Sequence, residues 1–522
     1  MRNLTIGKSL KLIVLFTIPL LIGNLFQQLY SFMDALIVGR TIGKDALAAV
    51  GATSSIVFLI IGFAQGTTAG LSILTAQAYG AHDYRRVRRS FGTSIWITVG
   101  ISLILTVAAV TMTRPLLTVM QTPPDIMDGS IAFVRVIYFG IIASMSFNLL
   151  SNMLRALGDS RTPLFFLIIA TIINIVLDFW FILGFHSGVA GAGYATVSAQ
   201  VIAALLCWIY IRMRIPLLMI RRRDLRFDWH DIVQHLKVGL PMGFQMSIIA
   251  IGAVILQVML NTLGTNAVAA YTAAGRIDQL ATLPSASFGV AMATFAAQNL
   301  GAKEYGRIRR GVYQTLMVNV GLSAVLGVVI ILFSKPLVNL FLGPNQPAVT
   351  ALAQTYFHFN ASMYWLLAIL FTIRNLLQGL GQTLVPTVAG FFELGMRAFA
   401  AIFLVVPFGF AGASAANPLA WFGSVLVLVS SYVRTMRRIR QQEDELAGHQ
   451  ELKKRLIDRQ RVSPLASVKR FLRVHWRRNL HIRTTSTLAK TRPMHLWSLM
   501  LRFLSAPFHA LLNAFTGAET CT

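Results

Sequence analysis

The stretch GKDALAA at residues 43–49 returns as GTNAVAA at residues 264–270, which lies 221 positions later in the chain. The same offset relates a glutamine and three arginines that follow each stretch: Gln77, Arg86, Arg88 and Arg89 correspond to Gln298, Arg307, Arg309 and Arg310. Further along, Asn152, Leu157, Gly158 and Pro163 return as Asn375, Leu380, Gly381 and Pro386. Self-similarity at a nearly constant offset, here 221 and then 223 positions, indicates a duplicated structural unit. We therefore predict two homologous halves.

Each half contains six mostly apolar segments, each of about 20 residues or more, the length that crosses roughly 30 Å of hydrocarbon. The predicted spans are residues 10–38, 46–79, 91–112, 131–157, 163–185 and 189–211, followed by 232–263, 267–300, 312–333, 351–380, 385–408 and 412–433. The chain is 55% hydrophobic and only 12% charged, which excludes the soluble and disordered classes. An even-numbered unit places both copies in one orientation. We predict an all-α membrane protein with twelve transmembrane helices in two six-helix bundles, related by a pseudo-two-fold axis along the membrane normal.

Arginine and lysine gather in alternate loops, after the second, fourth, sixth and eighth spans, whereas the loops between them are nearly uncharged. By the positive-inside rule we expect a multi-pass protein of the cell membrane with both termini cytoplasmic. The predicted domains are residues 1–215 as the first lobe, 216–231 as a cytoplasmic linker, 232–438 as the second lobe and 439–522 as a basic tail. The tail mixes basic and apolar residues, which favours an amphipathic helix on the anionic inner leaflet. Within it, residues 495–515 are interpreted as an interfacial helix and not as a thirteenth span.

Two carboxylates lie inside predicted spans of the first half, among apolar neighbours. A charged side chain near the centre of a bilayer costs about 2.5 to 3.5 kcal/mol on insertion scales. Carboxylates at Asp34 and Asp178 are therefore expected to have a function. Asn174 precedes Asp178 by one helical turn, and Tyr30 precedes Asp34 by the same spacing. These four side chains offer the means to share protons or to supply oxygen ligands to a small cation. The alternatives are that Asp34 pairs with Arg40 and that Asp178 only accepts hydrogen bonds between helices.

The second half carries intramembrane charges of both signs. Arg276 and Asp278 lie in its second span, and Glu393 and Arg397 lie in its fifth, where the spacing of four residues suits a helical ion pair. We interpret these four residues first as structural or gating pairs and second as groups that contact substrate.

Several short stretches are similar to the signatures of one transporter family. Residues 26–40 and 46–51 resemble the first helix pair of MATE (multidrug and toxic compound extrusion) transporters, and residues 154–163 and 297–302 resemble their later motifs. The resemblance implies two bundles around a V-shaped cleft and export of organic cations in exchange for protons or sodium ions. Together these stretches extend over roughly residues 8–438.

Within that family the sequence is most similar to the DinF-like branch, whose coupling site lies in the amino-terminal lobe. The resemblance assigns Tyr30, Asp34, Asn174, Asp178 and Thr196 to that cation and proton network, and Pro19 to the proline at which the first helix bends. The NorM-like branch has further carboxylates on its seventh and tenth helices, where this chain has only Gln245, Asn261, Asn360 and Arg374. This departure puts a second cation site in doubt.

The remaining function classes are weighed by what they would require. An enzyme would need a nucleophile or a metal constellation, and the sequence shows no such pattern. Direct use of ATP would need a Walker A sequence, which the chain lacks. We expect no cofactor beyond H⁺ or Na⁺ as the coupling ion. A flippase for a lipid-linked oligosaccharide would need a basic cleft, for which Arg276, Arg374 and Arg397 are candidates. The two-lobed repeat favours a rocking transporter over a channel and over a duplicated scaffold without a transport role. We expect small cationic or amphiphilic substrates, contact with membrane lipid, a monomer and, despite the net charge of +27, no nucleic acid.

Overall fold

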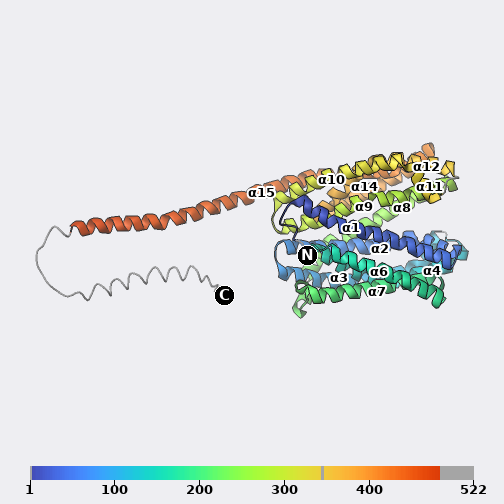
Figure 1. Cartoon of the computed structure of the whole chain (residues 1–522), viewed down its shortest axis with the longest axis horizontal. Helices are drawn as coiled ribbons and strands as arrows, with labels where there is room; N and C mark the ends of the chain where they lie inside the picture. The colour runs from blue at the N-terminus through green and yellow to red at the C-terminus, as the bar shows by residue number, and fades with distance from the viewer. Residues whose placement is uncertain (1–2, 121, 343–345, 482–522) are drawn as a thin grey trace. The chain divides into compact units, whose positions relative to one another are not determined.

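The computed structural model describes residues 3–120, 122–342 and 346–481. Its contacts divide the chain into two compact units, Met1–Asp444 and Glu445–Thr522. The first unit consists of long helices that lie side by side (Figure 1). The described part of the second unit, residues 445–481, is helical. The interfacial helix predicted at residues 495–515 lies outside the described residues.

The first lobe contains six spans. Its helices are α1 (Ser9–Thr41), α2 (Lys44–Gly80), α3 (Tyr84–Val119), α4 (Pro124–Phe139), α5 (Ile141–Ala156), α6 (Arg161–Phe179) and α7 (Gly188–Arg214). Helices α4 and α5 pass together as one span, bent by 46° at Gly140. A π-helical turn, Trp180–Gly184, continues α6. The predicted spans of this lobe are therefore confirmed, with a bend inside the fourth.

The second lobe repeats this order. Its helices are α8 (Trp229–Asn261), α9 (Thr265–Gly301), α10 (Tyr305–Leu332), the short α11 (Ser334–Leu342), α12 (Pro347–Asn360), α13 (Tyr364–Gly379), α14 (Leu384–Phe399) and α15 (Val405–His481). Helices α12 and α13 form one span, and a π-helical turn, Ala400–Leu404, again follows the fifth span. Gly409, with φ 56° and ψ −129°, interrupts α15 and separates the eleventh span from the twelfth. Counted in this way, the described helices make twelve spans.

The backbone of the loops repeats as the sequence does. His82 and Lys303, which follow the second helix of each half, have φ values of 58° and 59°. Gly158 and Gly381, which follow the fourth span of each half, have φ values of 82° and 80°. Left-handed conformations are uncommon, so their recurrence at equivalent positions is a sensitive test of the repeat. The duplication predicted from the sequence is present in the backbone.

Glycines bring α2 of the first lobe directly against α8 of the second. Gly66 and Gly70 on α2 face Gly239 and Gly243 on α8, and a Cβ atom at Gly66 would lie 2.4 Å from the carbonyl oxygen of Met242. Small residues four apart permit this close approach of helix backbones in membranes. The seam between the lobes is therefore built on backbone contact.

The lobes also meet at one end of the bundle, which carries the N-terminus and the loops after α2, α5, α7, α9 and α13; we call it the basic end. There Gln77 Nε2 of the first lobe donates to the carbonyl oxygen of Gly379 at 3.1 Å. In return, Gln298 Nε2 of the second lobe donates to the carbonyl oxygen of Ala156 at 2.7 Å. Because Gln77 and Gln298 are equivalent in the repeat, these hydrogen bonds form a reciprocal pair, as a two-fold relation between the lobes requires.

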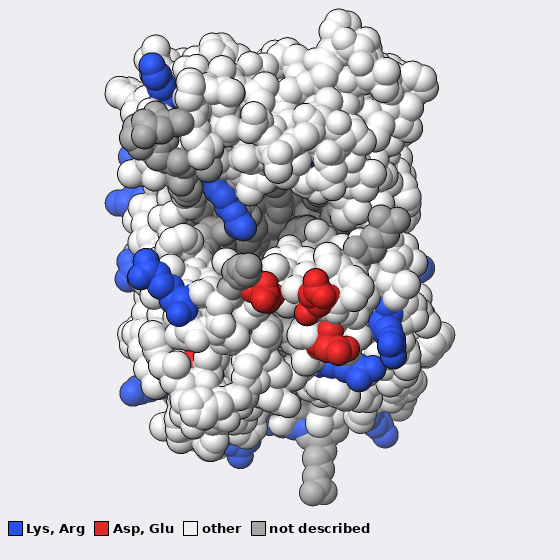
Figure 2. All heavy atoms as spheres, turned by 90° about the vertical axis from the view of Figure 1, so that its right-hand side faces the viewer, with Lys and Arg blue, Asp and Glu red and all other residues white. Residues whose placement is uncertain are grey.

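The opposite end of the bundle is hollowed. Figure 2 views this end and shows a depression between the two halves, with acidic side chains beside it. Exposed carboxylates of the first lobe lie at this end, Asp45 at the start of α2 and Asp125 and Asp128 at the start of α4. The first-lobe side of the opening is therefore acidic, whereas a basic side chain borders the hollow on the other side (Figure 2).

Candidate functional site

Helices α1, α6 and α7 bring the predicted residues of the first lobe together. The Tyr30 hydroxyl on α1 donates to Thr196 Oγ1 on α7 at 2.9 Å, a contact between residues 166 positions apart. Helix α1 packs along α6, which carries Asn174 and Asp178. The grouping that the resemblance implied for Tyr30 and Thr196 is a hydrogen-bonded contact in the structure.

Asn174 and Asp178 are both 0% exposed, and Asp34 is half-buried. Five buried polar atoms of these residues have no hydrogen-bond partner among the described residues: Asp34 Oδ1, both amide atoms of Asn174 and both carboxylate oxygens of Asp178. In the described part of the chain, Asp34 forms no ion pair with Arg40, and Asp178 accepts no hydrogen bond from another helix. Neither purely structural alternative for the two carboxylates agrees with these contacts.

Asp34 and Tyr30 lie one helical turn apart on α1, and Asp178 lies on the neighbouring helix α6. Asp34 precedes the end of α1 by seven residues, which places it about 10 Å from the hollowed end at the rise of an α-helix. Asp178 precedes the π-helical turn Trp180–Gly184 by two residues, and such turns are frequent at functional sites. The group therefore lies in the half of the first lobe that is nearer the hollow.

The chemistry of this group follows from its missing partners. A buried carboxylate without a donor or a counter-charge is costly in a medium of low dielectric constant. Binding a proton removes its charge, and binding a small cation compensates it; carboxylate, amide and hydroxyl oxygens are the ligands that hard cations prefer. The residues present suit either ion.

Helix α1 connects this group to the second lobe. Pro19 is buried inside α1, which continues through it as one helix of 33 residues, and the proline removes one backbone hydrogen bond at that point. One turn further on, Asn24 Nδ2 donates to Ser287 Oγ on α9 at 3.0 Å. A change in the bend of α1 would thus alter its contacts with both lobes. The bend at Pro19 remains a prediction.

In the second lobe, the expected ion pair of Glu393 and Arg397 is confirmed, at 3.1 Å. Sequence reasoning did not assign the third member: Arg374 Nη2 on α13 lies 2.6 Å from the other oxygen of Glu393 and donates to Ser424 Oγ at 3.0 Å. All three charged side chains are at least nine-tenths buried. The amide of Gln245 on α8 faces the same cluster. The position of Arg374 in an apolar stretch was the available sequence signal, but no nearby residue indicated that Glu393 is its partner.

The pairing considered for Arg276 and Asp278 is not found among the described residues. Asp278 accepts a hydrogen bond from the Tyr364 hydroxyl at 2.6 Å, and Arg276 is exposed. The reason is helical geometry, since side chains two positions apart on a helix do not face each other.

Replacing Glu393 by glutamine is expected to destabilise the protein more than replacing Arg397 by glutamine. The first change leaves two buried guanidinium groups without a counter-charge, a loss of about 3 to 5 kcal/mol, whereas the second leaves the Arg374–Glu393 pair intact. Thermal unfolding of the purified protein in detergent checks the order. A lower midpoint for Arg397→Gln than for Glu393→Gln would contradict it.

The chain matches known proteins over most of its length. The family model described as MatE matches residues 19–180 and 241–403, one segment in each lobe. The chain is 31% identical over 387 residues to "Probable multidrug resistance protein YoeA" of Bacillus subtilis, covering 73% of this chain and 83% of that protein. It is 29% identical over 396 residues to "Probable multidrug resistance protein YpnP" of the same organism, covering 75% and 88%.

Solved structures share the fold. The "Crystal structure of MATE in the bent conformation" superimposes with a TM-score of 0.76 at 23% identity and covers 84% of this chain and 97% of that one. The sequence match to both lobes, the duplicated six-span unit and the buried residues of the first lobe lead to one assignment. The chain belongs to the MATE family of multidrug efflux transporters.

Proposed function

We propose that this protein is a secondary active antiporter that exports organic cations in exchange for H⁺ or Na⁺, with the coupling ion bound in the first lobe. The observation that carries the proposal is the contrast between the lobes. Asp34 Oδ1 and both carboxylate oxygens of Asp178 lack partners among the described residues, whereas in the second lobe Glu393 is compensated by two arginines and Asp278 accepts a hydrogen bond from Tyr364. An uncompensated carboxylate is the one that gains most from a proton or cation.

In this mechanism, ion binding changes the conformation of α1 and with it the contact between the lobes. Tyr30 and Asp34 lie beyond Pro19 on α1, and Asn24 contacts α9 of the second lobe. Solved MATE structures of the same fold are described in a straight and in a bent conformation, and by analogy we propose two conformations of this chain. Coupling then arises because ion and substrate have different affinities for the two states. By the positive-inside rule the basic end is cytoplasmic, together with both termini and the tail.

Organic cations are the proposed substrates. The relatives carry the name of multidrug resistance proteins, and the acidic edge of the hollow attracts positively charged compounds. The flippase alternative requires a basic cleft, but Arg374 and Arg397 are buried and paired with Glu393, which leaves only Arg276 exposed among the three candidates. The contacts therefore favour drug export. We propose that the protein acts as a monomer.

The test is transport by the purified protein in proteoliposomes. Ethidium movement is followed by fluorescence while a proton gradient and a sodium gradient are imposed separately. Uphill movement driven by one gradient supports antiport and identifies the ion. Movement that only follows the ethidium gradient would refute it, and translocation of a pyrophosphate-linked lipid without ethidium transport would establish the flippase.

A further inference from the structure

The second lobe contains a counterpart of the ion site proposed for the first. Four of the buried residues of α14 lie 223 positions after buried residues of α6. These pairs are Pro163 and Pro386, Phe166 and Ala389, Ala170 and Glu393, and Asn174 and Arg397. Helix α14 packs on α8 as α6 packs on α1. Arg397 therefore holds the place in the second helix pair that Asn174 holds in the first.

Both carboxylates of the first-lobe group are missing from this counterpart. Asp178 corresponds to Ala401, which is buried in the π-helical turn after α14. Asp34 corresponds to Ile255, 221 positions later, and the next residue, Leu256, is apolar as well. Where the first lobe has two acidic side chains that gain from a bound cation, the second lobe has a side chain that is itself a cation.

An ion pair with Glu393 does not by itself explain Arg397. Glu393 already has a partner in Arg374, at 2.6 Å. Two guanidinium groups and one carboxylate give the cluster a net charge of +1 among buried residues. An extra charge buried between apolar helices is costly. Arg397 is therefore expected to do more than neutralise Glu393.

The contacts of Arg397 are those of a cation held between two helices. Its Nη2 lies 3.1 Å from Glu393 Oε1 on α14, and its Nη1 donates to the carbonyl oxygen of Ile249 on α8 at 3.4 Å. A Cβ atom at Gly252 would lie 3.2 Å from Arg397 Cδ and Nη1, so the glycine makes room for the side chain against α8. Carboxylate and carbonyl oxygens are also the ligands of a small hard cation. The guanidinium group thus joins α8 to α14 as a bound ion would.

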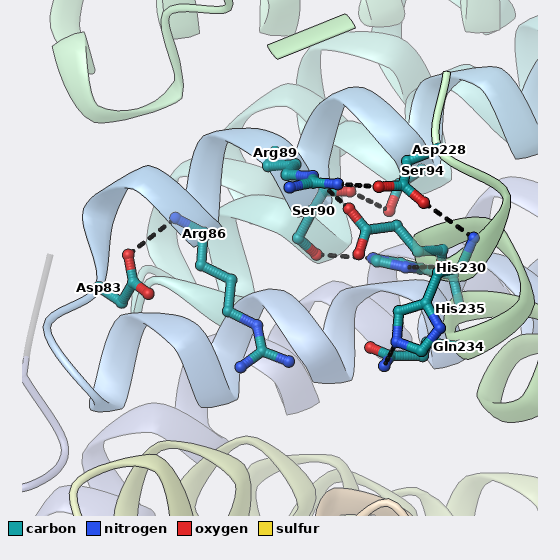
Figure 3. Close-up of polar contacts among 10 residues, drawn as sticks. Asp83, Arg86, Arg89, Ser90, Ser94, Asp228, His230, Gln234 and His235 are labelled. Atoms are coloured by element: carbon teal, nitrogen blue, oxygen red, sulfur yellow. Dashed lines mark hydrogen bonds and ion pairs between the residues drawn. The ribbon is translucent and has the colours of Figure 1, made fainter. Parts of the chain in front are cut away.

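At the basic end, α8 is fixed to the first lobe. Arg89 on α3 forms ion pairs with Asp228 and Asp231 at the start of α8, and Ser90 Oγ lies 2.8 Å from His235 Nε2. Figure 3 shows Arg89 and Ser90 facing Asp228 and His235 across the contact between the lobes.

The segment before α1 is fixed to the second lobe in a comparable way. Arg307 on α10 donates to the carbonyl oxygens of Leu4 at 3.1 Å and Gly7 at 2.6 Å. Both helices are thus anchored to the opposite lobe at the basic end. They differ in their other halves, where α1 carries Asp34 and α8 meets Arg397.

We propose that Arg397 is a permanently attached cation that takes the place of an exchangeable ion in the second lobe. The packing of α14 on α8 is then independent of ions, whereas the packing of α6 on α1 changes with them. Ion exchange, and the conformational change that it drives, are confined to α1 and the first lobe. Arg397 is a positioning residue, and its consequence for transport rests on the proposed antiport function.

The first test replaces the side chain by a free ion in the purified full-length protein. Arg397→Ala is expected to lower the midpoint of thermal unfolding, and millimolar guanidinium is expected to restore most of the loss by binding beside Glu393. Arg397→Lys, which keeps the charge, should lose less. The matched control is Leu394→Ala, which shortens an apolar side chain beside Gly252 and should not respond to guanidinium.

The second test leaves the second lobe unchanged, so it is informative even where Arg397→Ala does not fold. In Asn174→Arg the new guanidinium group lies one helical turn from Asp178. The wild-type midpoint is expected to rise when Na⁺ is added or the pH is lowered. The midpoint of Asn174→Arg should be equally high without the ion and should no longer respond to it, whereas the uncharged control Asn174→Leu should not gain this stability.

The outcomes separate this proposal from the antiport proposal. If guanidinium does not restore Arg397→Ala, or raises the midpoint of Leu394→Ala equally, Arg397 acts by packing and the proposal is wrong. It is also wrong if Asn174→Arg still responds to the ion, because a fixed cation then does not replace it. A wild-type midpoint that responds to neither ion would contradict antiport instead, and the guanidinium test would still decide whether Arg397 fills a cation site.

Discussion

The variant Asp178→Asn is expected to bind substrate but to lose gradient-driven efflux by about tenfold or more, since coupling energies of 1 to 3 kcal/mol are typical. Asparagine has the shape of aspartate but cannot exchange a proton or compensate a cation. Asp178 is 0% exposed, and neither of its oxygens has a partner among the described residues. Removing an uncompensated buried charge should therefore leave the thermal midpoint unchanged or raise it. Proteoliposome transport and thermal unfolding together check this combination.

Asp34→Asn should behave in the same way, because Asp34 is the other carboxylate of the group. The informative comparison is Asp278→Asn, which alters a carboxylate that already accepts a hydrogen bond from Tyr364 in the second lobe. That variant is expected to retain coupling. If Asp278→Asn abolished gradient-driven efflux while Asp178→Asn did not, the assignment of the coupling site to the first lobe would be wrong.

The second large effect concerns the reciprocal contact at the basic end. A Cβ atom at Gly80 would lie 1.9 Å from the carbonyl oxygen of Gln298, and a Cβ atom at Gly301 would lie 1.9 Å from that of Gln77. Ordinary contact begins at 3.4 Å, so either alanine substitution must move the two lobes apart at this end. We expect Gly80→Ala and Gly301→Ala to keep each lobe folded, to hold the basic end open and to reduce efflux by about tenfold or more.

The opening can be measured as a distance between spin labels placed on exposed residues of the two lobes, Arg161 and Lys303, at the basic end. The distance should increase in both glycine variants. The control is Gly100→Ala, because a Cβ atom there has no other atom within 4 Å, and its distance should equal that of the wild type. An unchanged distance in Gly80→Ala would show that the two lobes do not separate to accommodate the added methyl group.

The sequence by itself determined the elements and the repeat. The twelve spans could be located because membrane insertion depends on local properties, the length and hydropathy of a segment. The described helices begin up to seven residues before the predicted apolar segments, as α3, α4 and α10 do, because a helix continues beyond the hydrocarbon. Asp34, Asp178 and Glu393 were identifiable for a related reason, since a carboxylate in an apolar run is expensive wherever the rest of the chain lies. The pair Glu393 and Arg397 followed from helical spacing alone.

Only the tertiary structure decided which of these residues meet. Tyr30 contacts Thr196 across 166 positions, Gln77 contacts Gly379 across 302, and Arg374 proved to be the second partner of Glu393. Such contacts depend on which faces of the helices pack together, and between α2 and α8 that choice rests on facing glycines, which hydropathy does not reveal. The periodicity of one helix describes its own faces, whereas the site and the contact between the lobes arise from the packing of several helices.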